Sequence, residues 1–361
     1  MRIKLVDPSA FTPPYDHALA AALARAGADV ELVTSRFLYG PVPREEGYRV
    51  TELFYRRTAA RGPGAPGRMA LKLAEHVPDM VRLRRHVRES DVVHYQWLTV
   101  QQLDAFLLPP KRPRVLTAHD VLPREPRPGQ RAATRRLLRS MDAVVAHSEH
   151  GAARLREELG VEPERVHVIP HGAFEHLTRL PDERPLPDEL AAVERPVVLF
   201  FGLLRPYKGI DVLLDAWRSV DADAELWIVG MPRMDVAPLR ARADARVRFV
   251  PRFVSEPEIP AYFRRADVVV LPYRETEASG VLYTALAFGK AIVASDVGGF
   301  REVGAGRLVP PGDAGALSSA LTELLASESE RQQLQEAARN AAVSWDDVAA
   351  RTLALYRSLV T

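Results

Sequence analysis

Residues 197–217 read VVLFFGLLRPYKGIDVLLDAW, which is an apolar strand, a turn that contains glycine, and a helix. Residues 271–303 read LPYRETEASGVLYTALAFGKAIVASDVGGFREV and repeat this order of strand, turn and helix. Both turns therefore end at a helix N-terminus, where unpaired backbone N–H groups and the helix dipole favour an anion. Arg205 and Lys208 in the first turn add a planar guanidinium group and a compact ammonium group, which suit the two phosphates of a diphosphate.

The bulk composition predicts a soluble protein of two domains. A chain of 361 residues is too long for one ordinary hydrophobic core. The absence of cysteine excludes disulfides and thiolate metal sites. The first residues read as a buried strand without the apolar length of a signal peptide, and no apolar run has the length of a membrane span. We therefore expect a cytoplasmic protein.

Charge is divided unevenly along the chain. Residues 1–180 hold 28 basic and 21 acidic residues, whereas the remainder holds 21 and 26. Only five of the 49 basic residues are lysine, so a lysine inside a glycine turn, as Lys208 is, stands out. The basic, partly apolar helix predicted at 68–88 fits either a peripheral membrane contact with anionic lipid or an ordinary solvated face. Nucleic acid is a poorer partner, since no aromatic platform accompanies the charge.

Apolar strand-like runs alternate with helical patterns in both halves of the chain. The runs lie at 3–6, 30–34, 92–95, 115–118, 144–146, 166–169, 197–201, 226–229, 247–250, 268–271 and 292–294. The clearest helical patterns of the first half lie at 17–25, 69–88 and 151–159. Continuous β-branched strands between helices predict parallel sheets covered on both faces, and hence an α/β fold of two doubly wound domains. Such domains place their ligand sites at the carboxyl ends of the strands.

At residues 197–217 and 271–303 the chain resembles the family-4 retaining glycosyltransferases of GT-B fold. The resemblance implies two Rossmann-like domains that face each other across a cleft, with a C-terminal helix that crosses back to the first domain. The implied segments are an acceptor-binding domain (1–175), a linker (176–195), a donor-binding domain (196–343) and the returning helix (344–361). Four prolines between residues 174 and 196 support the linker, and Ser344 with Asp347 three residues on predicts the cap of the last helix.

The same resemblance implies transfer of a hexosyl unit from a nucleotide-diphosphate sugar to an acceptor hydroxyl, with retention at the anomeric carbon. A UDP-sugar is the favoured donor, and GDP- and dTDP-sugars stay open. We expect no cofactor and no metal, because Arg205 and Lys208 supply the charge where the diphosphate departs and no Asp-x-Asp pair is present. Gly202 opens this turn. Leu203 stands where the family usually has its arginine, so Lys208 is the firmer of the two assignments.

The second turn departs from the family at its paired glutamates. Thr284 occupies the second glutamate position, and the first falls at Thr276, between Glu275 and Glu277. We assign Glu277 to the hydroxyls of the donor sugar as a catalytic residue, and leave open whether Glu275 makes that contact. A threonine bonds one ribose hydroxyl where a carboxylate clamps two, so the base and ribose are not fixed by the sequence.

Further donor contacts are expected around these turns. Ser279 and the N–H groups of Gly280 and Val281 begin a helix and are predicted to hold the distal phosphate. Arg252 and Phe253 occupy the place where the family holds the base.

The histidines of the first half divide into two groups. His119 follows a predicted strand, and the resemblance implies that it faces the donor sugar as a catalytic residue. His171, in VIPHG, resembles the motif that lines the cleft near the hinge. His147 and His150 are interpreted as local structure.

The segment 8–16, PSAFTPPYD, is predicted to be a loop that prolines stiffen. Related enzymes often carry two glycines there, and this chain has none. The acceptor contact is therefore expected to differ, with Tyr15 and Asp16, together with His171, on the acceptor side.

Three alternatives stay open. Thr284 in place of glutamate favours a sugar-nucleotide-binding protein that has lost catalysis. A GT-B sugar-nucleotide epimerase would need two cleft carboxylates as acid and base, and no such pair is evident. A phosphorylase-like enzyme would need a lysine for pyridoxal phosphate, for which Lys290 is the spare lysine.

Overall fold

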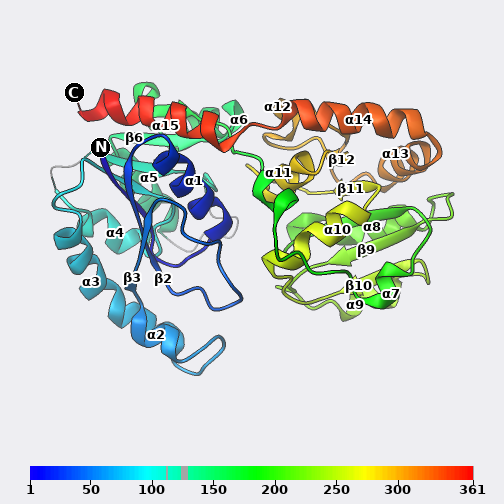
Figure 1. Cartoon of the computed structure of the whole chain (residues 1–361), viewed down its shortest axis with the longest axis horizontal. Coiled ribbons are helices and arrows are strands. Elements are labelled where there is room, and N and C mark those ends of the chain that lie inside the picture. The colour runs from blue at the N-terminus through cyan, green and yellow to red at the C-terminus, as the bar shows by residue number, and fades with distance from the viewer. Residues whose placement is uncertain (111–112, 123–128, 361) are drawn as a thin grey trace. The chain divides into compact units, whose positions relative to one another are not determined.

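The structure is a computed structural model that describes residues 1–110, 113–122 and 129–360 (Figure 1). Its internal contacts divide the chain into a first unit, Met1–His171 with Val343–Thr361, and a second unit, Gly172–Ala342. Each unit is built on one parallel sheet whose strands alternate with helices. The predicted α/β fold with two doubly wound domains is confirmed. Thr361, the last residue of the predicted final helix, lies outside the described residues.

The sheet of the first unit has the strand order β3-β2-β1-β4-β5-β6-β7. Its strands are β1 (Arg2–Asp7), β2 (Asp29–Ser35), β3 (Arg49–Phe54), β4 (Val92–Tyr95), β5 (Arg114–Thr117), β6 (Ala143–Ala146) and β7 (Val166–Val168). All neighbours pair in parallel, so every carboxyl end lies at one edge. The order reverses between β1 and β4, and such a reversal opens a crevice for a ligand.

The helices of this unit cover both faces of its sheet. They are α1 (Pro13–Arg25), α2 (Arg56–Ala60), α3 (Arg68–His86), α4 (Gln101–Leu107), α5 (Gln130–Arg139), α6 (Glu149–Glu157), the 3-10 turn η1 (Pro163–Arg165) and the C-terminal α15 (Trp345–Val360). The predicted loop through residue 16 is wrong, because α1 already begins at Pro13. Proline fits the first helical positions, where its missing N–H costs nothing and its φ is already helical.

The C-terminal helix α15 belongs to the first unit and packs against α1 (Figure 1). Ser344 caps it as predicted, since its Oγ accepts from the Asp347 N–H at 3.1 Å and donates to the Asp347 carboxylate at 2.7 Å. Tyr356 is fully buried, and its hydroxyl bonds the buried His94 of β4. The predicted return of this helix to the first domain is confirmed.

The sheet of the second unit has the order β10-β9-β8-β11-β12-β13, again all parallel. Its strands are β8 (Val197–Phe201), β9 (Glu225–Val229), β10 (Val247–Val250), β11 (Val268–Leu271), β12 (Ala291–Ser295) and β13 (Arg307–Val309). Val198 of β8 is in register with Val268 of β11. The order reverses between these two strands, so the ligand crevice of this unit is expected at their carboxyl ends.

Helices and 3-10 turns join the strands of the second unit. They are η2 (Glu175–Arg179), α7 (Asp188–Ala191), η3 (Pro206–Lys208), α8 (Ile210–Trp217), α9 (Ala237–Arg242), η4 (Glu256–Glu258), α10 (Ile259–Arg265), α11 (Gly280–Ala287), α12 (Phe300–Val303), α13 (Ala314–Ala326) and α14 (Glu328–Ala341). α8 buries an apolar stripe made of Ile210, Leu213, Leu214 and Trp217. This burial anchors the helix whose N-terminus faces the crevice.

The segment predicted as a linker, 176–195, lies within the second unit. Leu177 and Leu190 are buried there. The Arg184 N–H donates to the Pro257 carbonyl at 2.8 Å. Arg264 donates to the Thr178 carbonyl at 2.8 Å and forms an ion pair with Glu183. The first unit ends at His171, four residues before the predicted bound of 175.

Two strands are absent from the sequence prediction. β3 and β13 are the outermost strands of their sheets. β3 has the half-exposed pattern of an edge and contains Arg49 and Glu52, and β13 has three residues. Neither shows the continuous apolar run that marks the central strands.

Candidate active site

The carboxyl ends of β8 and β11 bring two turns of the second unit together. The two strands are neighbours, so the turn after Phe201 and the loop after Leu271 leave the same edge of the sheet. A Cβ atom added to Gly202 would lie 3.0 Å from the Lys208 Nζ and 3.0 Å from a methyl carbon of Val281. Only a residue without a side chain leaves room for this contact, and the φ of +106° at Gly202 also favours glycine.

Lys208 is the buried cation of this edge. It ends η3 and is 7% exposed. Its Nζ lies 4.9 Å from the centre of the Tyr273 ring, whose hydroxyl is 3.3 Å from the Ser279 Oγ. α8 and α11 begin after Gly209 and Ser279, and neither helix has a side-chain cap. The ammonium group therefore lies near the N-terminus of α11, whose N-cap residue makes no side-chain cap, an arrangement that binds a phosphate. The first N–H groups of α8, by contrast, donate to the Asp211 carboxylate.

Close backbone contacts fix the turn that carries Lys208. A Cβ on Gly209 would lie 1.9 Å from the Pro272 carbonyl oxygen, and the φ of Gly209 is +69°. Arg274, in the loop after β11, donates to the Pro206 carbonyl at 2.8 Å and forms an ion pair with Asp211 of α8. The loop after β11 thus clamps the turn after β8, so the position of the lysine does not depend on a bound ligand.

The other predicted cations lie in different surroundings. Arg205 is exposed at the start of η3. Arg252 and Phe253 follow β10, which is two strands away from β8 in the sheet. Arg252 forms an ion pair with Glu258 at 2.7 Å and donates to the Phe253 carbonyl at 3.0 Å. Burial and fixed geometry therefore distinguish Lys208 from both arginines.

The loop between β11 and α11 holds the predicted sugar and ribose contacts. Glu275 is exposed, whereas Glu277 is half-buried. The Thr276 hydroxyl donates to the Ala278 carbonyl at 2.8 Å and shapes this loop. The buried Thr284 hydroxyl donates to the Gly280 carbonyl at 2.8 Å, four residues back on its own helix. Thr284 thus uses its one proton inside α11 and retains only acceptor capacity for a ligand.

Three histidines at the carboxyl ends of β5, β6 and β7 pack around Tyr15 of α1. The centre of the Tyr15 ring lies 4.7 Å from that of His119, 5.4 Å from that of His147 and 4.9 Å from that of His171. The His147 ring lies 5.3 Å from each of the other two imidazoles. Trp345 at the start of α15 lies 5.0 Å from Tyr15. We call these three histidines and Tyr15 the histidine cluster, and sequence reasoning missed His147 as a member.

Burial keeps two of these histidines neutral. Desolvation, and then the neighbouring His147 and His171, lower the pKa of His119 well below its usual value. Burial lowers the pKa of His147 to about 4. The His147 Nδ1 donates to the Ile169 carbonyl at 3.1 Å, and its buried Nε2 has no hydrogen-bond partner within the described part of the chain. Neutral imidazoles exchange hydrogen bonds with hydroxyls, so the cluster suits a sugar or alcohol better than an anion.

Tyr15 and Asp16 are both buried on α1. Burial and the neighbouring Asp7 raise the pKa of Asp16 well above its usual value, so this carboxyl keeps its proton and shares it with Asp7. Asp7 accepts from the main-chain N–H groups of Ser9 at 3.1 Å and Thr12 at 3.2 Å. The Asp7–Asp16 pair is therefore occupied in holding the loop after β1. Sequence reasoning found no such pair because the two carboxyls come from a strand and a helix.

Within residues 1–110, 113–122 and 129–360, no three histidine, aspartate or glutamate side chains form a group that could hold a metal ion. No helix in the same ranges combines the length and apolarity that crossing a membrane requires.

Three features define a protein of the GT-B class: the two doubly wound units, the glycine turns that lead from β8 and β11 into helices, and the C-terminal helix that returns to the first unit. The structure is similar over 99% of this chain and 100% of the other to the Anabaena protein HepE in complex with UDP-glucose, with a TM-score of 0.77 and 20% identity. Residues 15–173 match the family described as Glycosyltransferase Family 4, and residues 195–327 match Glycosyl transferases group 1. The chain belongs to glycosyltransferase family 4.

Two curated relatives are similar to parts of the chain. It is 30% identical to the GDP-mannose:glycolipid 4-beta-D-mannosyltransferase of Xanthomonas campestris pv. campestris, over 62% of this chain and 68% of that one. It is 33% identical to the D-inositol 3-phosphate glycosyltransferase of Jonesia denitrificans, over 59% of this chain and 56% of that one. The second match thus spans little more than half the length of that relative.

Proposed function

We propose that this chain is a glycosyltransferase that moves a hexosyl unit from a nucleoside-diphosphate sugar to an acceptor hydroxyl. The observation that carries the proposal is the buried Lys208 beside the N-termini of α8 and α11, at the switch point of the second sheet. Membership of family 4 supports it. We assign the donor to the second unit and the acceptor to the first.

Departure of the diphosphate is the step that this site would assist. As the bond from the anomeric carbon to the phosphate oxygen breaks, negative charge grows on the diphosphate. The Lys208 ammonium and the N–H groups of Gly280 and Val281 would neutralise that charge without reorganising, because all three are already in place. We assign Arg205, which is exposed on the turn, to the same diphosphate once the donor is bound. These cations supply the charge that a metal provides in other transferases, so we propose metal-independent catalysis.

The nucleotide is the first property to test. The Xanthomonas relative is named for GDP-mannose, and the Anabaena structure contains UDP-glucose. We propose a UDP-sugar, with GDP and dTDP as alternatives. A thermal-shift panel of UDP, GDP, ADP and dTDP, each with magnesium or EDTA, should show one nucleotide that raises Tm equally in both, and Lys208→Ala should lose that shift. No shift with any nucleotide would contradict the diphosphate site.

The stereochemical outcome is a separate proposal. We propose retention at the anomeric carbon, on the resemblance to the retaining family and without an enzymic nucleophile. The Xanthomonas relative, which is named for a 4-beta linkage, is the reason to test inversion as the alternative. Proton NMR of the product should show the anomeric configuration of the donor at the new glycosidic bond, and the opposite configuration would contradict retention.

The other enzyme alternatives find less support. Lys290 donates from its Nζ to the main-chain carbonyls of Arg264 at 2.9 Å and Ala266 at 2.8 Å. It precedes β12, so it lies at the amino edge of the sheet, opposite the edge of Lys208. That position disfavours a pyridoxal phosphate site. The epimerase alternative requires two carboxylates that act as acid and base, and the pair that the structure shows, Asp7 and Asp16, is occupied with the loop after β1. If the chain binds sugar nucleotides but has lost catalysis, a nucleotide should raise Tm while no sugar is transferred.

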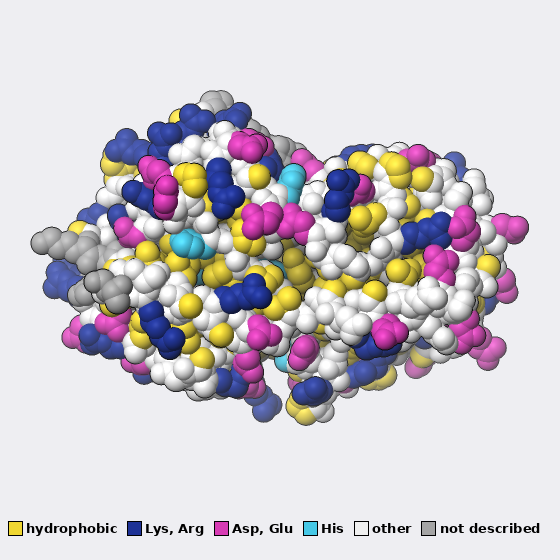
Figure 2. All heavy atoms as spheres, turned by 90° about the horizontal axis from the view of Figure 1, so that it is seen from above, with side chains coloured by type: hydrophobic (Ala, Val, Ile, Leu, Met, Phe, Trp, Pro, Cys, Tyr) yellow, Lys and Arg dark blue, Asp and Glu magenta, His cyan; other side chains and the backbone are white. Residues whose placement is uncertain are grey.

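We also propose that α3 contacts an anionic membrane surface. Met69, Leu73, Val77 and Val81 are exposed by 77%, 54%, 40% and 39%, and their spacing of four residues places them in one stripe. The same helix ends in the basic residues Arg84, Arg85 and His86. Basic side chains are also scattered over the other face of the first unit that Figure 2 shows, on the side of α15. An apolar stripe with basic neighbours binds at the boundary of headgroups and acyl chains.

Co-sedimentation with vesicles tests this contact. The chain should sediment with phosphatidylglycerol vesicles and stay in solution with phosphatidylcholine. The double variant Leu73→Gln with Val77→Gln should lose sedimentation, whereas Val42→Gln, which changes an exposed loop valine of the same unit, should not. Equal sedimentation of all variants would contradict the assignment to α3.

A further inference from the structure

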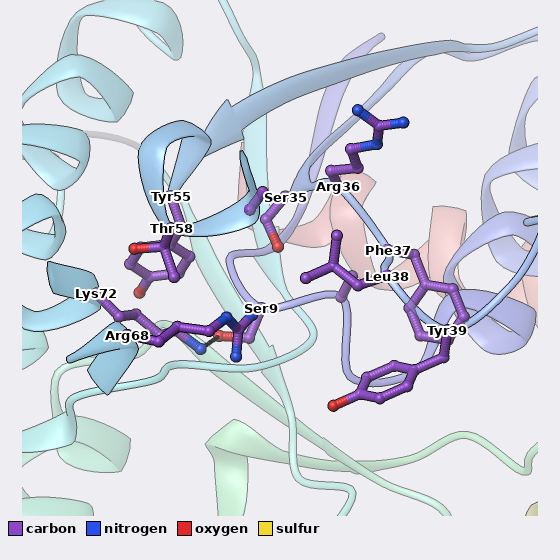
Figure 3. Close-up of a pocket in the computed structure, with 12 residues that line it drawn as sticks. Ser9, Ser35, Arg36, Phe37, Leu38, Tyr39, Tyr55, Thr58, Arg68 and Lys72 are labelled. Atoms are coloured by element: carbon purple, nitrogen blue, oxygen red, sulfur yellow. Dashed lines mark hydrogen bonds between the residues drawn. The ribbon is translucent and has the colours of Figure 1, made fainter. Parts of the chain in front are cut away.

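The first unit has a pocket at the carboxyl ends of β1, β2 and β3 (Figure 3). Its walls come from the loop after β1, the segment after β2 and the helices α2 and α3. It shares no lining residue with the histidine cluster. The pocket spans about 390 Å³, which includes space open to solvent.

Two cations of α3 form one wall of the pocket. Arg68 and Lys72 are one helical turn apart, and their side chains extend together toward Ser9 in Figure 3. The Lys72 Nζ donates to the Ser9 Oγ at 2.8 Å. The Arg68 Nε is buried without a hydrogen-bond partner among the residues that the structure describes. Like charges at this spacing repel, and burial together with Arg68 lowers the pKa of Lys72.

No described carboxylate forms an ion pair with either cation. Asp7 is the acid that acts on Lys72 through space. Its carboxylate is occupied by the N–H groups of the loop after β1 and by the proton shared with Asp16. The wall therefore holds positive charge that the described residues do not balance at close range. An anion in the pocket would relieve the repulsion between Arg68 and Lys72 and give the Arg68 Nε a partner.

A buried network holds this wall in place. The Lys72 Nζ lies 4.7 Å from the centre of the Tyr55 ring. The Tyr55 hydroxyl bonds the His76 Nδ1 at 2.7 Å, and the His76 Nε2 bonds Asp104 at 2.7 Å. Tyr55, His76 and Asp104 are each at most 3% exposed. Such a fully satisfied network preorganises the site, because its members do not move when a ligand arrives.

The opposite wall of the pocket is aromatic. The rings of Phe37 and Tyr39 meet edge to face at 5.6 Å, and Figure 3 places both on the far side of the pocket from Lys72. Ser35 lies between the two walls in that view. A ligand that fits both walls carries its charge at one end and a body with apolar faces at the other.

We propose that this pocket binds a phosphate group carried by the acceptor, so that the acceptor is a phosphorylated polyol, either in solution or as the headgroup of a lipid. The guanidinium group of Arg68 and the ammonium group of Lys72 bind two sides of a tetrahedral anion, and the Ser35 hydroxyl adds a further donor. The aromatic wall would hold the polyol. This inference rests on the proposed function, which makes the first unit the acceptor unit.

Calorimetric titration of the full chain with inorganic phosphate and with glycerol 3-phosphate tests the pocket. Lys208→Ala serves as the background, so that the proposed donor site does not take the ion. Each of Arg68→Gln and Lys72→Gln should raise Kd at least about tenfold, since each removes a charge-assisted bond. Arg131→Gln removes an exposed charge from α5 of the same unit and should leave Kd unchanged. Equal affinity in the double variant Arg68→Gln with Lys72→Gln would overturn the proposal.

Two further arms separate the sources of the phosphate. Glycerol 3-phosphate that binds more tightly than inorganic phosphate, and weakens in Arg68→Gln, assigns a soluble acceptor. Binding to vesicles of phosphatidylglycerol and not of phosphatidylcholine, weakened by Arg68→Gln and not by Arg131→Gln, assigns a headgroup. The proposal is overturned if none of inorganic phosphate, glycerol 3-phosphate and phosphatidylglycerol vesicles binds. A rise in Tm with a nucleotide, without phosphate binding to the pocket, would support the transferase proposal and contradict the pocket. Phosphate binding to the pocket without a rise in Tm for any nucleotide would support the anion site and contradict the proposed transferase function.

Discussion

Replacing Lys208 by methionine removes the charge of the proposed donor site and keeps most of its buried volume. The Lys208 Nζ lies close to Gly202, and a methionine, which has a similar length, fills most of the space of the lysine side chain. Folding should therefore survive, because the substitution leaves the glycine turn and the clamp by Arg274 intact. The transferase reaction should be nearly lost. This variant separates the charge of the residue from its packing, which an alanine substitution does not do.

The magnitude follows from the burial of Lys208, which is 7% exposed. Two charges about 4 Å apart at an effective dielectric constant of about 20 interact by about 4 kcal/mol. Part of that energy is already present in the bound donor, so we expect the transition state to lose about 3 kcal/mol. That loss corresponds to a fall of about 10² in kcat/KM, similar to the removal of one donor from an oxyanion hole.

The assay compares kcat/KM and urea denaturation for the wild type, Lys208→Met and Lys290→Met. Lys290 is the matched control, because it is the other described lysine of the second unit and donates only to main-chain carbonyls at the opposite sheet edge. Lys290→Met should cost about 1–3 kcal/mol of stability by leaving those carbonyls unpaired, with kcat/KM within twofold of the wild type. A Lys208→Met enzyme that folds and keeps more than a tenth of the wild-type kcat/KM would refute the site.

Three further predictions concern the scaffold. Gly209→Ala should destabilise the second unit by at least about 2 kcal/mol in urea denaturation, since its Cβ would lie 1.9 Å from a carbonyl oxygen. The pKa of Asp16, beside Asp7, is raised in the folded state, so the folded chain keeps a proton that the unfolded chain releases above pH 3.8. The free energy of unfolding should therefore fall as the pH rises from 3.8 to the folded pKa of Asp16. In Asp16→Asn, the free energy of unfolding should depend less on pH over this range. Tyr356→Phe should lower the unfolding free energy by about 1–3 kcal/mol by leaving the His94 Nδ1 unpaired, and an unchanged midpoint would contradict that hydrogen bond.

The fold was largely predictable because its central strands are buried on both faces. Such strands appear in the sequence as continuous apolar runs, and residues 197–201 and 268–271 match the buried strands β8 and β11 without error. β3 and β13 lack that signal, because β3 is half-exposed with charged residues and β13 has only three residues. The edge strand β10 was nevertheless predicted, at 247–250. The start of α1 was missed for a different reason. Pro13 and Pro14 were taken to stiffen a loop, although proline also begins helices.

The candidate site was predictable only where one continuous segment builds it. Lys208, Gly202 and the N-terminus of α8 lie within nine residues, so their spacing alone indicated an anion site. The histidine cluster and the pocket of the first unit are assembled by strand order instead. His147 follows β6 and gains its neighbours only because β5 and β7 flank that strand. Likewise, Ser9 and Lys72 are 63 residues apart and meet only because the loop after β1 folds against α3. The sequence therefore indicates where a phosphate of the donor would bind, whereas recognition of the acceptor depends on contacts that only the folded first unit creates.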